Sequence, residues 1–402
     1  MGMDGLAEKS FRRAATGAAG KTFGLIVLSF LIFSCGSGDD SPQSSAPPIQ
    51  VTLSNNPSPG FIYLANYESN LTPSPSTYTP YIMVLENSGN LKFYKEIVNS
   101  PAAFDFKIQP NGAISFYTLT SWSRSFFFLD GFITAMDLNY RVTGTFRVPG
   151  GDTDAHDSLM RPNGNIIMLS YQDVTMDLTQ FGGSPSAIVT DVRIVEIDSS
   201  GTKIFEWKGL DHFQIDETTS DISLQATPPN KIDYIHANSI DVAADGNLIL
   251  SCRHLDAVVK INYQTGDIIW RLGGKKSDFI FPNDPLGGPS HQHCARMLAN
   301  GDLLMFDNGN LHNPPVSRAI EYQLNENSTP KTATLVWQFM NDPPLFSFAT
   351  GSAQRLANGN TFIGWGTISN PAATEVAPDG TKVLELALPQ GMISYRAFKF
   401  DR

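Results

Sequence analysis

A short phrase recurs along the chain at intervals of about fifty residues, and this recurrence constrains the fold more than any other feature. The phrase is a polar turn containing a glycine, followed by an apolar run, as in RPNGNIIMLS and LANGDLLMF. The intervals between successive turn glycines are 52, 82, 55 and 58 residues, and the glycines are Gly112, Gly164, Gly246, Gly301 and Gly359. A period of about fifty residues is typical of a β-propeller, in which four-stranded blades close around a channel.

A second phrase alternates with the first and also favours an all-β chain. It is a strand that ends in tryptophan, at Trp207, Trp270 and Trp337. The many glycines (33), prolines (26) and phenylalanines (26) favour strands and tight connections. We therefore predict a six-bladed β-propeller over residues 51–402, with the tryptophans packed between blades. The interval of 82 residues predicts an insertion, which we place at Asp211–Lys231.

The first 35 residues have the features of a bacterial lipoprotein signal peptide. Basic residues, among them Lys9 and Arg12, precede the apolar stretch Phe23–Phe33, which is short for a membrane span. Small residues adjoin Cys35, which we predict to be lipidated, and residues 36–50 form a Ser/Pro/Gly tether. An ordinary signal peptide with an incidental cysteine is the alternative. We expect a lipid-anchored protein of the cell envelope, periplasmic or on the outer membrane, which contacts the membrane only through its anchor.

Charge and cysteine content narrow the classes of partner. The net charge of −11 argues against nucleic acid and against an anionic membrane surface. A small anionic substrate would need a local cationic site. Beyond Cys35 the chain has only Cys252 and Cys294, too few for a disulfide framework. They form either one bridge or two small buried apolar side chains.

Three histidines stand at matching points of the repeated phrase. His156 and His293 each precede their turn glycine by eight residues, whereas His236 precedes its glycine by ten. The longer spacing predicts an insertion or bulge in the strand that follows His236. In a propeller, the residue before each inner strand lies at the channel mouth, so these imidazoles are expected to meet there. Seven residues after the turn glycines come Tyr171, Arg253 and Asn308, at the same mouth.

Several readings of this cluster stay open. Three histidines are a ligand set for zinc, as in a metal-dependent hydrolase, although Arg253 would repel a cation. A propeller can also bind an anionic ligand or a partner protein without turnover. Asn308 is interpreted as a turn residue. The remaining histidines are expected in loops or at the surface, namely His212, His254 and His312.

The phrases around these residues resemble those of the bacterial arylsulfotransferase (arylsulfate sulfotransferase) family, enzymes that move a sulfuryl group between phenols without a nucleotide donor. The resemblance runs from about Asn56 to the C-terminus and is strongest from His236 to Asn310. The family features occur in order as His-x-Asn-Ser (His236–Ser239), Ser-x-Arg (Ser251–Arg253), Trp-Arg-Leu-Gly-Gly (Trp270–Gly274), Gln292-His293 and Phe-Asp-Asn-Gly (Phe306–Gly309).

The resemblance implies a six-bladed propeller, no cofactor, no metal, an aryl sulfate donor and a phenolic acceptor. It implies that His293 is the nucleophile that becomes sulfated, in a ping-pong cycle. His291 lies two residues away and is the alternative nucleophile, but Gln292-His293 fits the family pattern. The sulfuryl oxygens would be held by His156, His236, Asn238 and Arg253, and we expect Thr350, which approaches the Gly359 turn, to contact one of them.

The side chains suit this chemistry. Sulfuryl transfer from an aryl sulfate resembles phosphoryl transfer, in which positioning and charge stabilisation dominate. A neutral imidazole such as His293 attacks readily and also leaves readily. The planar guanidinium of Arg253 matches the sulfuryl oxygens. His156 or His236 can move the proton of the phenol, a contribution of roughly 10²–10⁴-fold.

Overall fold

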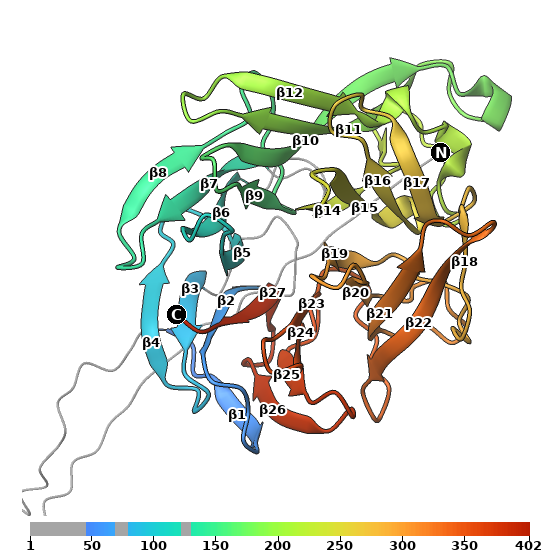
Figure 1. Cartoon of the computed structure of the whole chain (residues 1–402). Coiled ribbons are helices and arrows are strands. Elements are labelled where there is room, and N and C mark those ends of the chain that lie inside the picture. Colours follow the sequence, from blue (N-terminus) through green and yellow to red (C-terminus); the bar gives the residue numbers. More distant parts are fainter. Residues whose placement is uncertain (1–45, 69–78, 122–129) are drawn as a thin grey trace, which may run out of the picture. The chain divides into compact units, whose positions relative to one another are not determined.

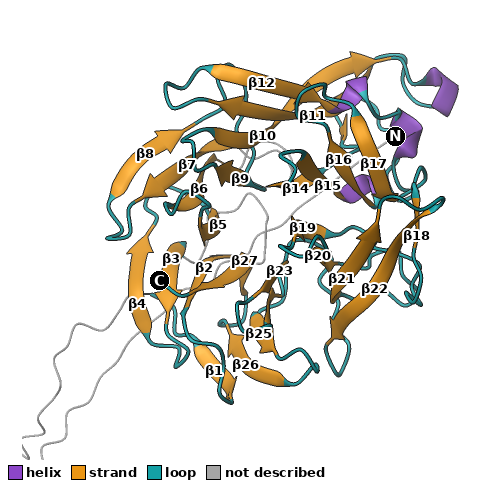
Figure 2. Cartoon of the chain, viewed as in Figure 1, coloured by secondary structure: helices purple, strands orange, loops and turns teal. Residues whose placement is uncertain are grey.

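The computed structural model describes residues 46–68, 79–121 and 130–402, which form six β-sheets arranged around a central axis (Figures 1 and 2). The predicted all-β, six-bladed propeller is therefore confirmed. The helices of the described part are 3₁₀ turns of three residues each, η1 (Thr179–Phe181), η2 (Gly209–Asp211), η3 (Ile215–Glu217) and η4 (Arg253–Leu255). The predicted signal peptide, Cys35 and most of the tether lie outside the described residues and stay predictions.

The main strands of each blade run antiparallel and follow one another from the axis outwards. Blade 1 comprises β27 (Met392–Phe400), β2 (Phe61–Glu68), β3 (Tyr81–Leu85) and β4 (Leu91–Glu96). Blade 2 comprises β5 (Ala103–Ile108), β6 (Ile114–Ser121), β7 (Asp130–Met136) and β8 (Val142–Phe146). Blade 3 comprises β9 (Ser158–Met160), β10 (Ile166–Met176), β11 (Ala187–Ile197) and β12 (Lys203–Lys208), and the short β13 (Lys231–Ile232) pairs with β11 in parallel.

The second half of the ring is built in the same way. Blade 4 comprises β14 (Ala237–Val242), β15 (Leu248–Cys252), β16 (Ala257–Ile261) and β17 (Ile268–Gly273). Blade 5 comprises β19 (His293–Met297), β20 (Leu303–Asp307), β21 (Arg318–Asn325) and β22 (Lys331–Met340), with β18 (Phe279–Ile280) on its outer edge. Blade 6 comprises β23 (Ser352–Arg355), β24 (Thr361–Gly364), β25 (Ala373–Val376), β26 (Lys382–Ala387) and β1 (Gln50–Ser54).

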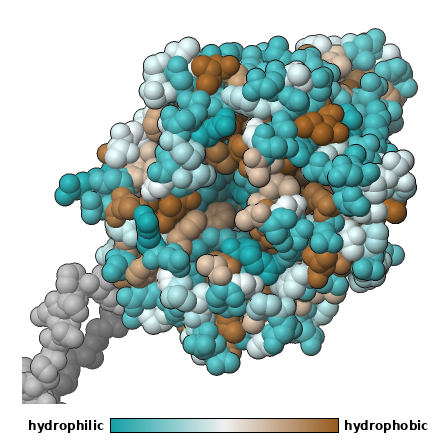
Figure 3. All heavy atoms as spheres, in the orientation of Figure 1, coloured by the Kyte–Doolittle hydropathy of each residue, from teal (hydrophilic) through white to brown (hydrophobic). Residues whose placement is uncertain are grey.

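Strands from the two ends of the chain close the ring. The last strand, β27, pairs with β2 as the innermost strand of blade 1, and β1 pairs with β26 as the outermost strand of blade 6 (Figure 1). Both pairings use strand edges that would otherwise be open. In the face shown in Figure 3, the ring is hollowed near its centre.

Apolar side chains packed between neighbouring blades form the core. Trp270 of blade 4 packs with Leu303 and Met305 of blade 5. The indole of Trp207 donates to Gly266 O at 2.9 Å, and that of Trp337 donates to Pro378 O at 3.1 Å. These contacts cross from one blade to the next, so the predicted role of the tryptophans between blades is confirmed.

The turn glycines and the long interval also have structural explanations. All five turn glycines have φ between 84° and 90°, a left-handed conformation that glycine adopts without strain. The expected insertion is present as the segment that carries η2 and η3. Strands β10 and β11 are also long, with 11 residues each, and account for the rest of the interval. No helix among the described residues is long and apolar enough to cross a membrane.

Candidate active site

The beginnings of three inner strands bring the predicted histidines together. His156 stands two residues before β9, His236 stands one residue before β14, and His293 is the first residue of β19. All three are buried, at 8%, 3% and 1% exposure. The rings of His156 and His236 have centroids 4.7 Å apart. The structure thus gathers these side chains at one end of the channel.

The bulge predicted after His236 is present, at Asn238. Strand β19 has a comparable irregularity between His293 and Arg296. Counted back from the turn glycines, Asn238 therefore matches His293 at eight residues, and His236 matches His291 at ten. Two sets of polar side chains therefore lie at the mouth, one eight residues and one ten residues before the turn glycines, whereas the sequence suggested a single set.

The hydrogen bonds of His293 fix which ring nitrogen carries the proton. Nδ1 lies 2.7 Å from Asn308 Oδ1 and 3.1 Å from His291 O. The amide of Asn308 is oriented by its Nδ2, which donates to Ser347 O (2.7 Å) and Thr350 O (3.0 Å). Nδ1 therefore faces two acceptors and must donate. The backbone N–H of Thr350 donates to Nε2 at 3.1 Å, so Nε2 holds the lone pair.

Burial keeps His293 neutral. It lowers the pKa of this imidazole well below its usual range, and the nearby charge of Arg253 lowers it further. Smaller contributions in the same direction come from His236 and His156. A neutral imidazole whose Nε2 lone pair is held only by a backbone N–H is suited to nucleophilic attack.

The other two histidines are held by carboxylates. Nδ1 of His156 lies 2.8 Å from Asp154 Oδ2, and Nδ1 of His236 lies 2.5 Å from Asp233 Oδ2. Each Nδ1–H donates to its carboxylate, which fixes the tautomer and stabilises the ring if it accepts a proton. Burial, with the charges of His156 and Arg253, lowers the pKa of His236 well below its usual range.

Arg253 is a buried cation without an anionic partner. It is the first residue of η4, is 9% exposed, and donates from Nη2 to Phe348 O at 2.9 Å. Its Nε has no partner, and it forms no ion pair among the described residues, although the charges of Asp221, Asp233 and Asp256 are close enough to oppose the effect of burial on its pKa. Burial lowers its pKa to about 10. Since an unpaired buried charge is costly, the arrangement is suited to an anion that supplies the missing acceptor.

Asn238 and Thr350 lie in the same cluster but differ in what they offer. Asn238 is fully buried; its Nδ2 donates to Gln292 O at 2.7 Å, and its Oδ1 has no partner. Thr350 has φ of 62°, and its Oγ1 is buried without a partner. Besides its backbone N–H on His293, Thr350 therefore has a hydroxyl available for a ligand.

His291 and His254 extend the row of imidazoles away from the mouth. The ring centroids of His236 and His254 are 4.6 Å apart, and those of His254 and His291 are 5.9 Å apart. His254 lies in η4, the connection between β15 and β16, as expected for a loop residue, but it is not at the surface: it is 4% exposed and its Nδ1 donates to Asp233 O. Both ring nitrogens of His291 lie 3.0 Å from carboxylates, those of Asp221 and Asp256, so neither nitrogen faces an open position.

Aromatic side chains of blades 1 and 2 border the histidines. Tyr395 of β27 lies beside His156, with centroids 5.9 Å apart. Phe104 packs against Tyr395 at 5.7 Å and against Tyr67 at 5.0 Å. The hydroxyl of Tyr395 has no partner, and burial raises its pKa well above its usual value. Sequence alone could not select these rings from the many aromatic residues, because blade 1 joins strands from opposite ends of the chain.

The residues with metal-ligand spacing are not the three histidines considered from the sequence. Among the described residues, the group that could hold an ion is Asp233, His236 and His254, whose ligand atoms lie within 4.8 Å of one another. Its closest contact is the hydrogen bond between His236 and Asp233, and the cation Arg253 lies nearby. Cys252 and Cys294 are free and buried, so they form no disulfide.

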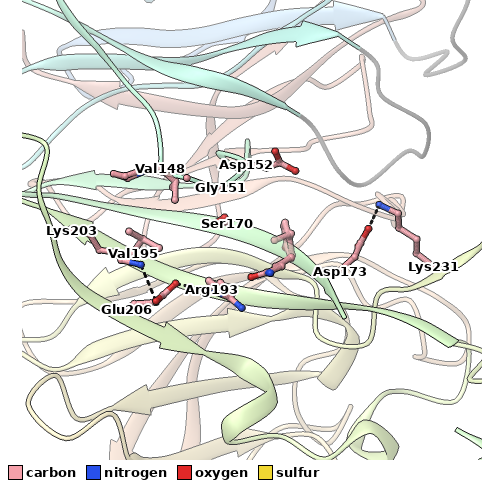
Figure 4. Close-up of a pocket in the computed structure, with 14 residues that line it drawn as sticks. Val148, Gly151, Asp152, Ser170, Asp173, Arg193, Val195, Lys203, Glu206 and Lys231 are labelled. Atoms are coloured by element: carbon pink, nitrogen blue, oxygen red, sulfur yellow. Dashed lines mark hydrogen bonds and ion pairs between the residues drawn. The ribbon is translucent and has the colours of Figure 1, made fainter. Parts of the chain in front are cut away.

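A cavity of about 400 Å³ is lined by residues of β10, β11 and β12 of blade 3 and by the loop that precedes β9 (Figure 4). Its cationic side chains are paired within the protein. Lys203 and Arg193 contact Glu206 at 3.0 Å and 3.1 Å, and Lys231 contacts Asp173 at 2.6 Å. Unlike the mouth with Arg253, it therefore offers no cation without an ion pair.

The chain matches the family model of the arylsulfotransferases (ASST) over residues 49–396. No curated protein matches it significantly. Among solved structures it is similar to a protein of unknown function from Bacteroides caccae, with TM-score 0.49 and 14% identity over 86% of this chain and 100% of that chain. It is also similar to virginiamycin B lyase from Staphylococcus aureus, with TM-score 0.40 and 13% identity over 85% and 88%. Both TM-scores lie below 0.5, so neither likeness bears on function. The family match covers most of the chain, which therefore belongs to the arylsulfotransferase family.

Proposed function

We propose that the protein transfers a sulfuryl group from an aryl sulfate ester to a phenol, without a nucleotide, through a sulfated His293. The family supports aryl sulfate transfer in general. The observation that carries the finer proposal is the lone pair of His293 Nε2, held in one buried cluster with the unpaired guanidinium of Arg253. The cluster thus holds a nitrogen that can attack sulfur beside a cation that can bind the negatively charged sulfate ester.

In the first half-reaction, Nε2 of His293 attacks sulfur and the bond between sulfur and the aryl oxygen breaks. The N–H of Thr350 gives up its hydrogen bond to Nε2 as this nitrogen attacks, and Arg253 and the Thr350 hydroxyl donate to the sulfuryl oxygens, where negative charge is concentrated. The leaving phenolate takes the Nε2 proton of doubly protonated His156, whose Nδ1–H stays hydrogen-bonded to Asp154. Nδ1 of His293 keeps its proton and its hydrogen bond to Asn308 throughout.

In the second half-reaction, an acceptor phenol occupies the position that the first phenol left. His156 removes its proton, the phenol oxygen attacks sulfur, and the N–S bond breaks to restore the lone pair of His293 Nε2. The rings of Tyr395 and Phe104 beside His156 would bind the aromatic ring of the donor and then of the acceptor. The net reaction conserves every proton and requires no metal or nucleotide.

The direct test is the mass of the intact protein after treatment with a chromogenic aryl sulfate. We expect an increase of one sulfuryl group, its loss on addition of a phenol, and release of the donor phenol in step with acceptor. His293→Ala should abolish both signals. His212→Ala is a matched control, because His212 stacks on Trp207 away from the cluster. Transfer that survives His293→Ala would contradict the proposal.

The same experiment separates the alternatives. A binding propeller would retain the anion without a change in covalent mass. A metal-dependent hydrolase, with an ion at Asp233, His236 and His254, would release phenol without acceptor and would lose activity with a chelator. A sulfotransferase of the proposed type keeps its activity in chelator.

We also propose that the protein is lipidated at Cys35 and anchored in the cell envelope. The support is the sequence of residues 1–35 alone. Metabolic labelling with a fatty acid and membrane fractionation test it. Cys35→Ala should release a soluble, unlabelled protein, whereas label that persists in this variant would exclude Cys35 as the attachment point.

A further inference from the structure

The three histidines of the mouth have similar positions but different partners for Nδ1. His156 and His236 donate to carboxylates, at 2.8 Å to Asp154 and at 2.5 Å to Asp233. His293 donates to a neutral amide, Asn308 Oδ1, at 2.7 Å. The proposed nucleophile is thus the one of the three whose partner has no charge.

A carboxylate is available next to this amide but is used elsewhere. Asp307 Oδ2 accepts from Arg318 Nε (2.8 Å) and lies 3.0 Å from His312 Nε2. Its Oδ1 accepts from the backbone N–H groups of Ser290 (2.9 Å) and Gly309 (3.1 Å). Both oxygens are therefore occupied by an arginine and by the loop backbone, and the adjacent amide alone reaches the nucleophile.

The charge of the Nδ1 partner matters because sulfation makes the imidazole cationic. A carboxylate on Nδ1–H would form a charge-assisted bond to the sulfated ring, roughly twice as strong as a bond to a neutral acceptor. Such a bond favours formation of the sulfated histidine and opposes its breakdown by the same amount. A neutral amide fixes the tautomer without this penalty for the second half-reaction.

We propose that Asn308 is a positioning residue that keeps sulfated His293 reactive, because it orients Nδ1–H through a neutral acceptor. The inference rests on the proposed function and concerns the balance between its two half-reactions. His156, by contrast, must carry a second ring proton before the first half-reaction and again after the second, and its carboxylate partner Asp154 stabilises that cation. Asp233 fixes the tautomer of His236 in the same way.

The test is Asn308→Asp in single-turnover experiments. Donor alone should still sulfate the variant at a rate within about threefold of wild type. Acceptor should then discharge the sulfated protein more slowly, by about tenfold or more, which corresponds to one pKa unit of extra stabilisation of the cation. Equal losses in both half-reactions, or an unchanged discharge rate, would overturn the inference. Because only sulfated molecules are followed, a partly folded sample does not alter the ratio.

Two controls separate charge from structure. Asn308 also holds the loop at Ser347 through its hydrogen bond to Ser347 O. The Ser317 hydroxyl holds the same loop, because it accepts from Ser347 N at 2.8 Å. Ser317→Ala should therefore disturb the loop without changing the charge of the Nδ1 partner. We expect it to leave the ratio of half-reaction rates unchanged; a ratio shifted as in Asn308→Asp would assign the effect to the loop. Asn308→Leu, which offers no acceptor, should slow sulfation and should not lengthen the life of the sulfated protein.

A measurement on the wild-type protein does not depend on any variant folding. Nitrogen-15 NMR of histidine-labelled protein should show the His293 ring protonated at Nδ1, and protonation at Nε2 would overturn the inference. Failure of the proposed function is distinct, because the wild-type protein would then gain no sulfuryl mass at all.

Discussion

At the scale of single residues, Arg253 combines the electrostatic cost of a buried charge with its proposed role in binding an anion. Its guanidinium is 9% exposed, and its single hydrogen bond to the protein goes to a backbone carbonyl. Such a group destabilises the free protein until an anion binds. Stability and function should therefore respond to this residue in opposite directions.

We predict that Arg253→Met lowers kcat/KM for aryl sulfate by about 10²–10³-fold, as for loss of a principal anion donor. The free protein should become more stable by about 1–3 kcal/mol, because the unsatisfied polar group is gone. Inorganic sulfate should raise the Tm of wild type and leave that of the variant unchanged. Arg193→Met, at a residue paired with Glu206, is the control with normal activity. A variant destabilised without substrate would contradict the prediction.

The buried histidines predict acid sensitivity of the fold. Burial lowers the pKa of His236 and His293 well below the usual value and that of His254 to about 3. Below about pH 6.5 the unfolded chain takes up protons that the folded chain refuses, so stability falls with pH, by up to about 1.4 kcal/mol per pH unit for each histidine. Asp233, whose pKa burial raises, offsets part of this loss.

Denaturant unfolding between pH 7.5 and 5 measures this slope. His254→Gln should reduce it by about one histidine equivalent, since Gln has no titrating group. Above about pH 6.5 these three histidines are neutral in both the folded and the unfolded chain, so they should not make the free energy of unfolding depend on pH there. A stability that stays level from pH 7.5 to 5 in the wild-type protein would show that the histidines titrate normally in the fold.

How far the sequence predicts the site differs from residue to residue. The repeated phrase pointed to these histidines because His156 and His293 stand eight residues before a turn glycine and His236 stands ten residues before one. Asn308 was found at the mouth but interpreted as a turn residue, since a hydrogen bond to a ring nitrogen leaves no periodic signal. His254 was expected in a loop or at the surface; it lies in the connection η4, but its contacts with Asp233 and His236, which leave no periodic signal, bury it.

At the scale of elements, the inner strands depend on close approach between blades. Gly364, at the end of β24, faces β27 across the seam where the chain closes the ring. A Cβ at this position would lie 2.7 Å from Ala397 N and 2.7 Å from Ser352 Oγ. The same Ser352 hydroxyl donates to Ala397 O at 2.9 Å and ties the two blades together.

We predict that Gly364→Ala destabilises the protein by about 1–3 kcal/mol, the usual range for overpacking. The physical reason is that backbone, which cannot rotate away, occupies the space for the new methyl group. Gly151→Ala is the matched control, because its nearest neighbours lie at 3.3 Å and 3.4 Å and it sits in an exposed loop. The free energy of unfolding from urea titration measures both, and equal values for the two variants would count against a tight seam.

At the scale of the whole molecule, the ring has six blades although the sequence contains five turns of the first phrase. The inner strand of blade 1 is β27 and its neighbour is β2, so the turn that would join them does not exist. The period of the repeated phrase predicted the number of blades, but it did not predict which strands from the two ends of the chain pair with one another. Pairing between strands so distant in the chain is decided by the fit of the closed ring.

The blades are also joined at the axis by one carboxylate. Asp157, beside β9, accepts from Lys107 of blade 2 (2.5 Å), Arg296 of blade 5 (2.6 Å) and the backbone N–H of Ile240 of blade 4 (3.1 Å). Arg396 of blade 1 lies 3.4 Å away. Burial alone would raise the pKa of Asp157, but Arg296, Lys107 and Arg396 outweigh it and hold the pKa well below its usual range. Asp105 of blade 2 shares two of these cations, at 2.6 Å from Lys107 Nζ and 2.8 Å from Arg396 Nη1, so two carboxylates balance cations from three blades.

We predict that Asp157→Asn destabilises the protein by about 3–5 kcal/mol, the usual effect of removing one partner from a buried ion network. The loss should greatly exceed that of Asp198→Asn, whose carboxylate caps an exposed turn with hydrogen bonds that Asn can also accept. Because the lost charge joins blades and not strands within a blade, sheet content by circular dichroism should be retained in the folded variant. Urea unfolding followed by tryptophan fluorescence measures the difference. A cost below about 1 kcal/mol, the range of an exposed pair, would mean that the blades do not need this shared anion to close the ring.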